Sequence, residues 1–232
     1  MSVLALIPAR LGSRGILKKN FRALAGRSPV ERAWQCAEAV TPWVGITTDA
    51  TTTEIAPLGT LASEAILWVV RPAALAQDDT PMIEVVRHAL AQIPGPADQM
   101  ILLVEPTQPL REPKHLHAAL AALTADWDSV VTLTPIPRTH APGSVLMCDS
   151  TLTVSPWQGS WVARPTRRQA PPQPYIADGT AYVFRRHTVQ AYGNIYGEYV
   201  RGLLIPPEET CPLDDPCDWA EADRRLRERE HG

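Results

Sequence analysis

Short apolar runs and segments with helical spacing alternate along the first half of this chain. Mostly apolar, strand-like runs occupy residues 3–7, 43–48, 66–70, 100–104 and 129–133. Segments whose apolar residues recur at helical spacing lie between them, at residues 28–39, 53–62 and 113–123 and from residue 80 onward. This alternation predicts a mostly parallel β-sheet with helices on both faces.

Two of the predicted helices begin with known start signals. Ser28 is expected to cap the first helix, with Pro29 at its first position. Thr80 is expected to start a later helix, with Pro81 in its first turn. Four residues of that later helix are expected to face the core: Val85, Val86, Ala89 and Leu90.

The pattern changes between residues 135 and 175. Prolines become frequent there, and short alternating runs at 145–147 and 152–154 replace the long apolar runs. We expect a hairpin or small subdomain inserted into the α/β body, with the exposed apolar surface that often marks an interface. Residues 180–184 are expected to resume the sheet, and residues 217–230 to form a final helix. Residues 1–232 are therefore predicted to form one domain that carries this extension.

The most informative polar segment directly follows the first apolar run. Pro8 ends that run, and the next loop carries two glycines, a hydroxyl and several cations: Arg10, Gly12, Ser13, Arg14, Gly15, Lys18 and Lys19, followed by Asn20. Glycines let a backbone turn sharply near a ligand, and cations with exposed amides suit a polyphosphate. Open α/β sheets bind nucleotides at the carboxyl ends of their strands. The loop is therefore a candidate nucleotide site, and a solvated basic turn is the alternative.

Charge and composition restrict the partners. The net charge of -3 argues against nucleic acid, because binding a phosphate backbone needs a basic surface. No apolar run approaches the roughly 18 residues of a membrane span, and no signal-peptide pattern opens the chain. The scattered Cys36, Cys148, Cys211 and Cys217 lack zinc-site spacing, so we expect reduced thiols in a cytoplasmic protein. The sequence also lacks a P-loop, a GxGxxG fingerprint and a GxSxG elbow.

Four later segments join the first loop in a known order. They are RPAALAQDDT at 71–80, LLVEPTQPLR at 102–111, RPTRRQAPPQPYIADGTAYVF at 164–184 and LDDPCDWAE at 213–221. Together with the loop, they resemble the acylneuraminate cytidylyltransferase family, which activates sugar acids as CMP conjugates. The resemblance implies a three-layer α/β/α Rossmann-like nucleotidyltransferase fold with a mostly parallel sheet. It also implies transfer of CMP from CTP to a small anionic acceptor, with release of pyrophosphate.

The resemblance assigns roles to individual residues. Nucleotide binding falls to Ala9, Arg10, Gly12, Ser13, Arg14, Asn20, Arg71 and Asp78. The residues expected to carry catalysis are Arg10, Arg14, Lys19 and Asp214. Acceptor binding falls to Glu105, Thr107, Arg168 and Tyr182, and Arg111 is either a site member or a cap or ion-pair partner of the following helix. Asp214 is expected to hold Mg²⁺, which needs few protein ligands when phosphates supply the rest. Asp215, before Pro216, is expected to cap the last helix.

Each of these roles has a simpler alternative or a weakness. Arg71 can be read as a surface arginine, and Asp78 with Asp79 as a helix-capping pair. The chain also departs from the family at four positions: Leu17 and Glu105 replace a proline and a glutamine, Ile176 replaces an arginine near the sugar carboxylate, and Pro212 replaces a metal-binding aspartate. A carboxylate at Glu105 repels an anionic acceptor unless it meets a metal, a hydroxyl or an amine. Ile176 cannot pair with a carboxylate.

The acceptor therefore stays open between a nonulosonic sugar acid and a small phosphonate such as phosphonoformate, which relatives of the family use. The resemblance also implies a homodimer in which residues 135–175 reach across to a second subunit. Two other classes stay open. One is a nucleotidyltransferase that uses another nucleoside triphosphate and a sugar phosphate, and the other is a catalytically silent nucleotide-binding homologue.

Overall fold

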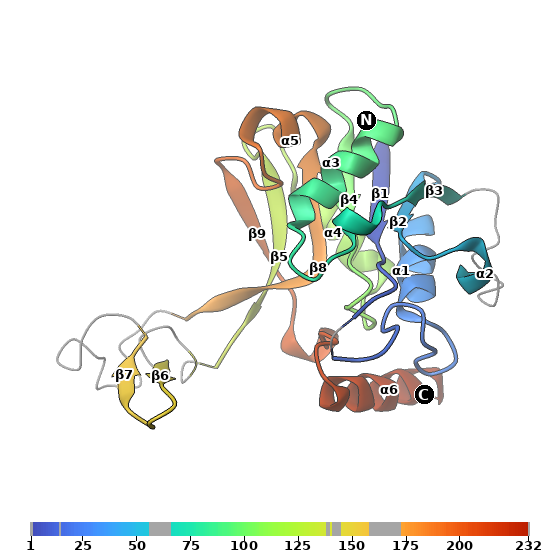
Figure 1. Ribbon diagram of the computed structural model, residues 1–232. Helices are drawn as coiled ribbons and strands as arrows, with labels where there is room; N and C mark the ends of the chain where they lie inside the picture. Colours follow the sequence, from blue (N-terminus) through green and yellow to red (C-terminus); the bar gives the residue numbers. More distant parts are fainter. Residues whose placement is uncertain are drawn as a thin grey trace.

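A twisted sheet forms the centre of the protein. The computed structural model describes residues 2–13, 15–55, 66–137, 140, 145–157 and 173–231. Within these ranges, seven strands lie in the order β3-β2-β1-β4-β8-β5-β9 (Figure 1). Their bounds are β1 (Val3–Pro8), β2 (Val44–Thr48), β3 (Ile66–Val70), β4 (Met100–Leu103), β5 (Ser129–Pro135), β8 (Tyr175–Arg185) and β9 (Val200–Leu204). All neighbours pair in parallel except β8, which is antiparallel to β4 and to β5. The predicted mostly parallel sheet is confirmed.

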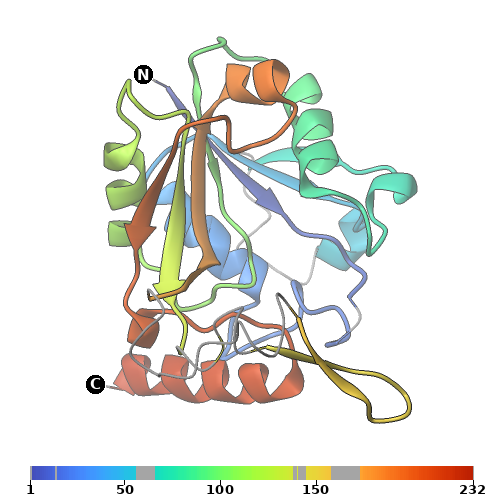
Figure 2. The same cartoon turned by 90° about the vertical axis from the view of Figure 1, so that its left-hand side faces the viewer.

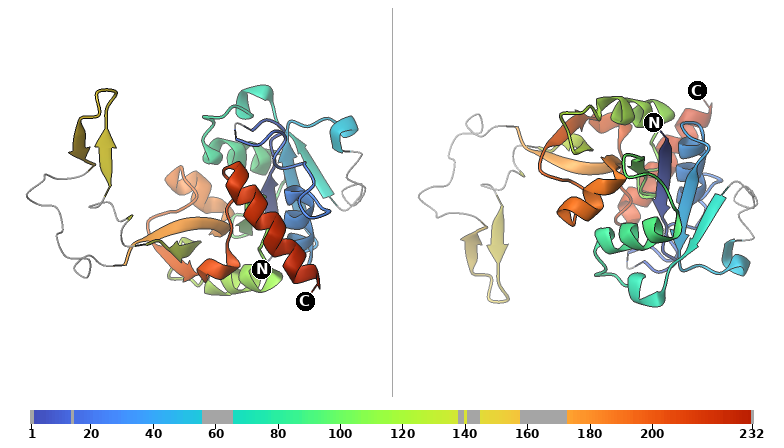
Figure 3. Two further views of the ribbon diagram at one scale, coloured as in Figure 1. Left: turned by 90° about the horizontal axis from the view of Figure 1, so that it is seen from below. Right: turned by 90° about the horizontal axis from the view of Figure 1, so that it is seen from above.

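Helices cover both faces of this sheet and one of its ends. They are α1 (Pro29–Glu38), α2 (Thr52–Ile55), α3 (Met82–Gln92), α4 (Pro113–Ala122), α5 (Arg186–Tyr192) and α6 (Pro216–His231). Helices α1 and α4 pack on one face, and α3 and α5 on the other (Figure 2). Helix α6 lies across the carboxyl ends of the parallel strands (Figure 3). The predicted three-layer α/β/α fold is confirmed.

The period of the first strand explains the two cores. Side chains of a strand alternate between the faces of its sheet. Leu4 and Leu6 join the buried cluster under α3 and α5, whereas Ala5 and Ile7 join the cluster under α1 and α4. All four are at most 1% exposed. A continuous apolar run is therefore what a strand covered on both faces requires.

The helix starts agree with the sequence in part. Ser28 caps α1 in a reciprocal box, because its backbone N–H donates to Glu31 Oε2 at 2.7 Å and its hydroxyl accepts from the Glu31 N–H. The predicted start of the later helix at Thr80 is wrong: α3 begins at Met82, because Pro81 has the extended backbone of an N-cap residue. Of the helix predicted at 53–62, the structure shows α2, and residues 56–62 lie outside the described residues.

The second half of the sheet contains more structure than predicted. Strand β8 begins five residues before the predicted 180–184, and α5 and β9 were not predicted. Strand β9 lies at the edge of the sheet, and four of its five residues are exposed. Its sequence therefore lacks the continuous apolar run of a central strand. Helix α5 has only seven residues, which is too short to show a clear helical period.

A small hairpin projects from the body. The chain leaves the sheet at the end of β5 and re-enters it at the start of β8, and between them β6 (Leu146–Cys148) pairs antiparallel with β7 (Val154–Pro156) (Figure 1). Its large apolar side chains are exposed, as the sequence suggested: Val145, Leu146, Met147, Leu152, Val154 and Trp157. The treatment of 135–175 as an extension of one domain stays a prediction.

Two further expectations concern the whole chain. The four cysteines carry free thiols in the structure, as the sequence indicated. Within the described part of the chain, none of the helices combines the length and the apolar character that a bilayer crossing needs.

Candidate active site

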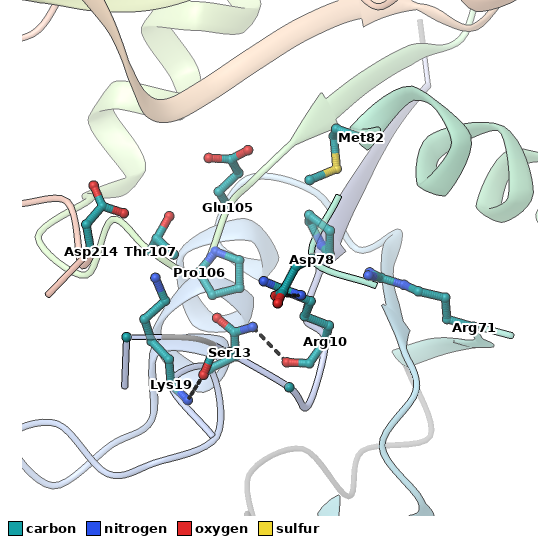
Figure 4. Close-up of a pocket in the computed structure, with 14 residues that line it drawn as sticks. Arg10, Ser13, Lys19, Arg71, Asp78, Met82, Glu105, Pro106, Thr107 and Asp214 are labelled. Carbon is teal, nitrogen blue, oxygen red and sulfur yellow. Dashed lines mark hydrogen bonds and ion pairs between the residues drawn. The ribbon is translucent and has the colours of Figure 1, made fainter. Parts of the chain in front are cut away.

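A cleft of about 360 Å³ opens at the carboxyl ends of β1, β3 and β4 (Figure 4). The loops after these strands line it together with the segment before α6. Ten predicted residues line it: Arg10, Gly12, Ser13, Lys19, Asn20, Arg71, Asp78, Glu105, Thr107 and Asp214. Gly15 of the predicted loop lines it as well, and so do Pro8, Met82 and Pro106, which the sequence did not single out as site residues. One cleft thus gathers residues from four separate parts of the chain.

Hydrogen bonds from its own residues hold the first loop in shape. The Ser13 hydroxyl donates to the Ile16 carbonyl and accepts from the Lys19 backbone N–H at 3.2 Å. The Leu11 N–H donates to Asp49 Oδ1 at 2.7 Å. Ser13 therefore orders the loop, and Asp49, at the end of β2, anchors it. The sequence assigned Asp49 no role in the site.

The Asn20 side chain makes one hydrogen bond to the first loop and leaves its amide oxygen without a partner among the described residues. Its Nδ2 donates to the Arg10 carbonyl at 2.9 Å, which fixes the orientation of the amide (Figure 4). Its Oδ1 is buried, and no described residue donates to it. A buried acceptor without a partner is costly, so this oxygen is suited to a donor on a bound ligand.

The first loop meets the segment before α6 across one wall of the cleft. Lys19 Nζ donates to the Leu213 carbonyl, 194 residues away in sequence. A Cβ atom on Gly15 would lie 2.6 Å from the Asp214 carbonyl oxygen, so only glycine permits this approach. Burial lowers the pKa of Lys19, and the negative charge of Asp214 opposes this shift. The contact places a cation beside a carboxylate that lines the same cleft.

The start of α6 leaves the Asp214 side chain available. Asp215 Oδ1 accepts from the N–H groups of Cys217 and Asp218, at 2.7 and 2.9 Å, so the predicted cap is confirmed. Asp218 Oδ2 accepts from the N–H groups of Asp214 and Asp215, each at 3.0 Å. Asp215 and Asp218 thus satisfy the helix terminus, and Asp214 is not needed for it.

Two arginines lie at the opposite end of the cleft. Arg71 is 5% exposed and its Nη2 donates to the Thr47 carbonyl at 2.9 Å, so it is no surface arginine. Burial lowers its pKa to about 10, which leaves it charged at neutral pH. Arg10 forms an ion pair with Asp78. The alternative that Asp78 caps a helix is wrong, because Pro81 is the N-cap residue of α3.

Glu105 is the most unusual group in the cleft. Its carboxylate receives no hydrogen bond and forms no ion pair with the described residues, and burial raises its pKa although the charge of Arg111 opposes the shift. Gly179 (φ +74°) makes room for it, because a Cβ there would lie 2.8 Å from Glu105 Oε2. The position that the family fills with glutamine therefore presents an unpaired acid to the cleft.

Arg111 lies behind the cleft. It is 8% exposed, its Nε donates to the Thr180 carbonyl at 2.6 Å, and its Nη2 donates to the carbonyls of Gly179 and Glu105 at 3.0 and 2.5 Å. It does not line the cleft. The sequence offered a helix cap or an ion pair as its alternative role, but Arg111 instead holds Gly179 and Thr180 of β8 against the loop after β4.

Gln108 makes a second connection that the sequence did not predict. It is 1% exposed, its Nε2 donates to the Asp178 carbonyl, and its Oε1 accepts from the Cys211 N–H at 3.0 Å. The Leu213 N–H donates to the Thr107 carbonyl at 2.9 Å. Gln108 thereby joins β8, the loop after β4 and the segment that leads to Asp214. Gln108 lies within the segment LLVEPTQPLR, between Thr107 and Pro109, and the resemblance gave it no role.

Besides Arg111, two predicted residues within the described part of the chain do not line the cleft. Ala9 is fully buried beneath it, and its N–H donates to the Thr47 carbonyl at 2.9 Å. Tyr182 lies opposite Leu103 within the sheet and packs edge-to-face on Tyr196, with ring centroids 6.4 Å apart. Burial raises its pKa. Arg14 and Arg168 lie outside the described residues.

Comparison with known proteins defines the class. The sequence model of the cytidylyltransferase family matches residues 4–146, which is more than half of the chain. The chain belongs to this family and is a CTP-dependent nucleotidyltransferase. Among its members, the predicted resemblance to the acylneuraminate cytidylyltransferases is confirmed by two curated relatives.

These relatives are distant. A CMP-N,N'-diacetyllegionaminic acid synthase of Legionella pneumophila subsp. pneumophila is 28% identical over 95% of this chain and 94% of its own length. An N-acylneuraminate cytidylyltransferase of Escherichia coli O18:K1:H7 is 26% identical over 94% of this chain, which spans 50% of that longer protein.

Two solved structures share the fold. A CMP:2-keto-3-deoxy-manno-octonic acid synthetase complexed with CTP superposes with a TM-score of 0.70, at 14% identity, over 99% of this chain and all of the other. A 4-diphosphocytidyl-2C-methyl-D-erythritol synthase from Anaerococcus prevotii superposes with a TM-score of 0.64, also at 14% identity, over 97% and 96% of the two chains. At this identity the likeness supports the fold alone.

Replacing Gln108 with leucine is expected to lower the free energy of unfolding by about 2–4 kcal/mol, because two buried backbone groups lose their partner. Urea denaturation followed by circular dichroism measures the loss. Gln77→Leu is the matched control, since Gln77 is exposed and makes one local bond to the Ala73 carbonyl; its effect should stay within about 0.5 kcal/mol. Equal losses in the two variants would contradict the connecting role of Gln108.

Proposed function

We propose that this enzyme transfers CMP from CTP to a small anionic acceptor and releases pyrophosphate. The observation that carries the proposal is the contact between the first loop and the segment before α6, with Lys19 bound to the Leu213 carbonyl beside Asp214. It brings phosphate-binding groups and a carboxylate to one cleft. That arrangement fits a reaction in which the protein positions a triphosphate and neutralises its charge.

Two regions of the cleft hold different parts of the nucleotide. Arg10 and Lys19, with Arg14 on the same loop, hold the triphosphate, and Asp78 keeps the Arg10 guanidinium in place through its ion pair. The buried Oδ1 of Asn20 accepts from a donor on the nucleoside, and Arg71 supports the same end. The acceptor oxygen then attacks the α-phosphorus in line, and pyrophosphate leaves.

The carboxylates of the cleft fit a magnesium ion. Within the described ranges no three His, Cys, Asp or Glu side chains gather as a dedicated metal site. Magnesium on a nucleotide usually takes only one or two carboxylates and the phosphates. Asp214 would hold it, with its side chain facing the cleft and its N–H engaged by Asp218. When bound, the ion offsets negative charge on the phosphates.

The acceptor that we favour is a nonulosonic sugar acid of the sialic type. Both curated relatives are named for the activation of such acids. We place the acceptor near Glu105 and Thr107, with Arg168 as a further contact. A small phosphonate such as phosphonoformate is the second candidate, because Ile176, which is 53% exposed, replaces the arginine that lies near the sugar carboxylate in the family.

The assembly that we propose is a homodimer joined through the β6–β7 hairpin. Leu152 is 79% exposed and Trp157 56% exposed, although both are large apolar side chains. A second copy of the chain would cover this surface, as the family resemblance implies. Burying it would provide the apolar contact area that a stable association needs.

Lys19→Gln is expected to lower the rate of pyrophosphate release about 100-fold or more, because it removes a preorganised cation from the triphosphate. The assay uses CTP with N-acetylneuraminic acid, a legionaminic-type acid and phosphonoformate as separate acceptors, and UTP, GTP and dTTP as alternative nucleotides. Lys18→Gln is the control, since Lys18 does not line the cleft. Full activity of Lys19→Gln, or CTP binding without turnover on any acceptor, would remove the proposed mechanism.

Glu105→Gln restores the residue that the family usually carries, so the fold should be kept. The change is expected to raise KM for a sugar acid about tenfold, because a charge-assisted bond to a hydroxyl is weakened. The KM for phosphonoformate should fall, because a repulsive charge is removed, and the KM for CTP should change less than about twofold. Initial rates of pyrophosphate release measure all three. Glu112→Gln, outside the cleft, is the control; the same acceptor preference in Glu105→Gln and wild type would contradict the role of Glu105.

Leu152→Asp is expected to convert a dimer of 25.4 kDa chains into monomers, because a charge replaces an apolar side chain at the proposed interface. Leu152 has φ +63°, a region that aspartate tolerates, so the hairpin turn should be kept. Size-exclusion chromatography with light scattering measures the mass. Val70→Asp, at a residue of β3 that is 75% exposed, should leave the mass unchanged. A monomeric wild-type protein would refute the proposed assembly.

A further inference from the structure

A second polar crevice lies behind the loop that follows β4. It has a volume of about 310 Å³ and lies between α1, the start of α4 and α6. Three arginines from three different elements line it: Arg32 of α1, Arg111 of the loop and Arg229 of α6. None of the described residues that line it is acidic. The crevice is therefore a separate, basic site that shares Arg111 with the rear of the active site.

Arg111 has one free nitrogen at this crevice. Its Nε and Nη2 are engaged by the carbonyls of Thr180, Gly179 and Glu105, whereas its Nη1 has no partner in the described part of the chain. The charge of Arg111 lowers the pKa of Cys36 against the larger effect of burial, so the guanidinium lies near that thiol, which also lines the crevice. The unengaged edge of a guanidinium that is more than nine-tenths buried thus faces the crevice.

The other arginines are held in place by backbone contacts. Arg32 Nη2 donates to the carbonyls of Leu24 and Ala25, at 3.0 and 2.7 Å. Arg229 Nη1 donates to the Leu110 carbonyl at 3.0 Å. These bonds keep two flexible side chains at the crevice in the absence of a ligand, so less conformational entropy is lost when an anion binds.

Neighbouring acids leave the crevice basic. Glu112 lies 3.2 Å from Arg229, and Asp223 feels the charge of Arg32, but neither carboxylate lines the crevice. Gln35 adds a neutral donor, because its Oε1 accepts from Arg27 at 3.0 Å while its Nε2 has no partner among the residues described. Planar guanidinium groups bind phosphate-type oxygens through paired hydrogen bonds.

We propose that this crevice binds a small tetrahedral oxoanion of the phosphate class, with Arg111 Nη1 at its base and Arg32 and Arg229 at its sides. Free phosphate and pyrophosphate share this chemistry. An anion here would hold the Arg111 guanidinium in position. Through its hydrogen bonds, Arg111 would then hold the carbonyls of Gly179 and Glu105, which lie beside the proposed acceptor position. The site is independent of the identity of the acceptor.

The test is calorimetric titration of the full-length protein with inorganic phosphate and, separately, with pyrophosphate. Phosphate can also enter the nucleotide cleft, so each titration is repeated with saturating CTP and in Arg10→Gln. Phosphate binding that persists under both conditions is expected, with the dissociation constant about tenfold higher in Arg229→Gln and in Arg32→Gln. Arg224→Gln changes an exposed arginine of α6 whose partners are Glu221 and Glu228, and it should bind phosphate as the wild type does.

Three outcomes would overturn the proposal. They are loss of all phosphate binding when CTP fills the cleft, loss of binding in Arg10→Gln, and equal affinity in Arg229→Gln and wild type. Circular dichroism of each variant establishes folding. If Arg32→Gln is misfolded, Arg229→Gln decides the matter alone, since Arg229 is exposed and its replacement leaves the core intact. Tighter binding of pyrophosphate than of phosphate would identify the reaction product as the ligand, and the reverse would identify free phosphate.

Discussion

The proposed active site depends on one contact between chain segments that are far apart in sequence. Lys19 reaches the Leu213 carbonyl, and Gly15 lets the first loop come close to Asp214. Neither residue could achieve this if α6 were not fixed against the loop. An apolar cluster that includes Leu24, Leu110 and Leu226 provides that support. Helix α6 therefore supports the proposed active site from outside, although none of the described residues that line the cleft belongs to it.

The antiparallel strand β8 supports the loop after β4 from behind the cleft. Because it runs against β4, its early residues lie beside the loop after β4, where the site is built. Arg111 and Gln108 take advantage of this arrangement by binding three consecutive carbonyls, those of Asp178, Gly179 and Thr180. A parallel strand in that place would bring its other end to the cleft. The reversed strand thus gives the loop after β4 a backbone frame to which Arg111 and Gln108 bind.

The sequence predicted the parts of this protein whose signal is local. Mostly apolar runs defined the buried strands, and a loop of glycines and cations after the first of them defined one wall of the cleft. The sequence did not predict the edge strand β9, because an exposed strand needs no apolar run. It did not predict the role of Gln108, because the partners of this side chain, Asp178 and Cys211, are distant in sequence. Glu105 was visible as a departure from the family, but its lack of a partner depends on how β8 and the loop pack together.

Ile176 and Glu105, the two departures from the family that concern the proposed acceptor, have opposite effects on the choice of acceptor. Their surroundings determine which effect is stronger. Ile176 removes a cation from a position that is 53% exposed, where water and salt weaken any ion pair. Glu105 adds an unpaired carboxylate at a half-buried position, where the effective dielectric constant is lower and each interaction is stronger. The effect of Glu105 is therefore the larger one. We infer that the cleft selects an acceptor that brings a hydrogen-bond donor to this carboxylate, as the hydroxyl groups of a sugar acid do and the oxygens of a fully ionised phosphonate do not.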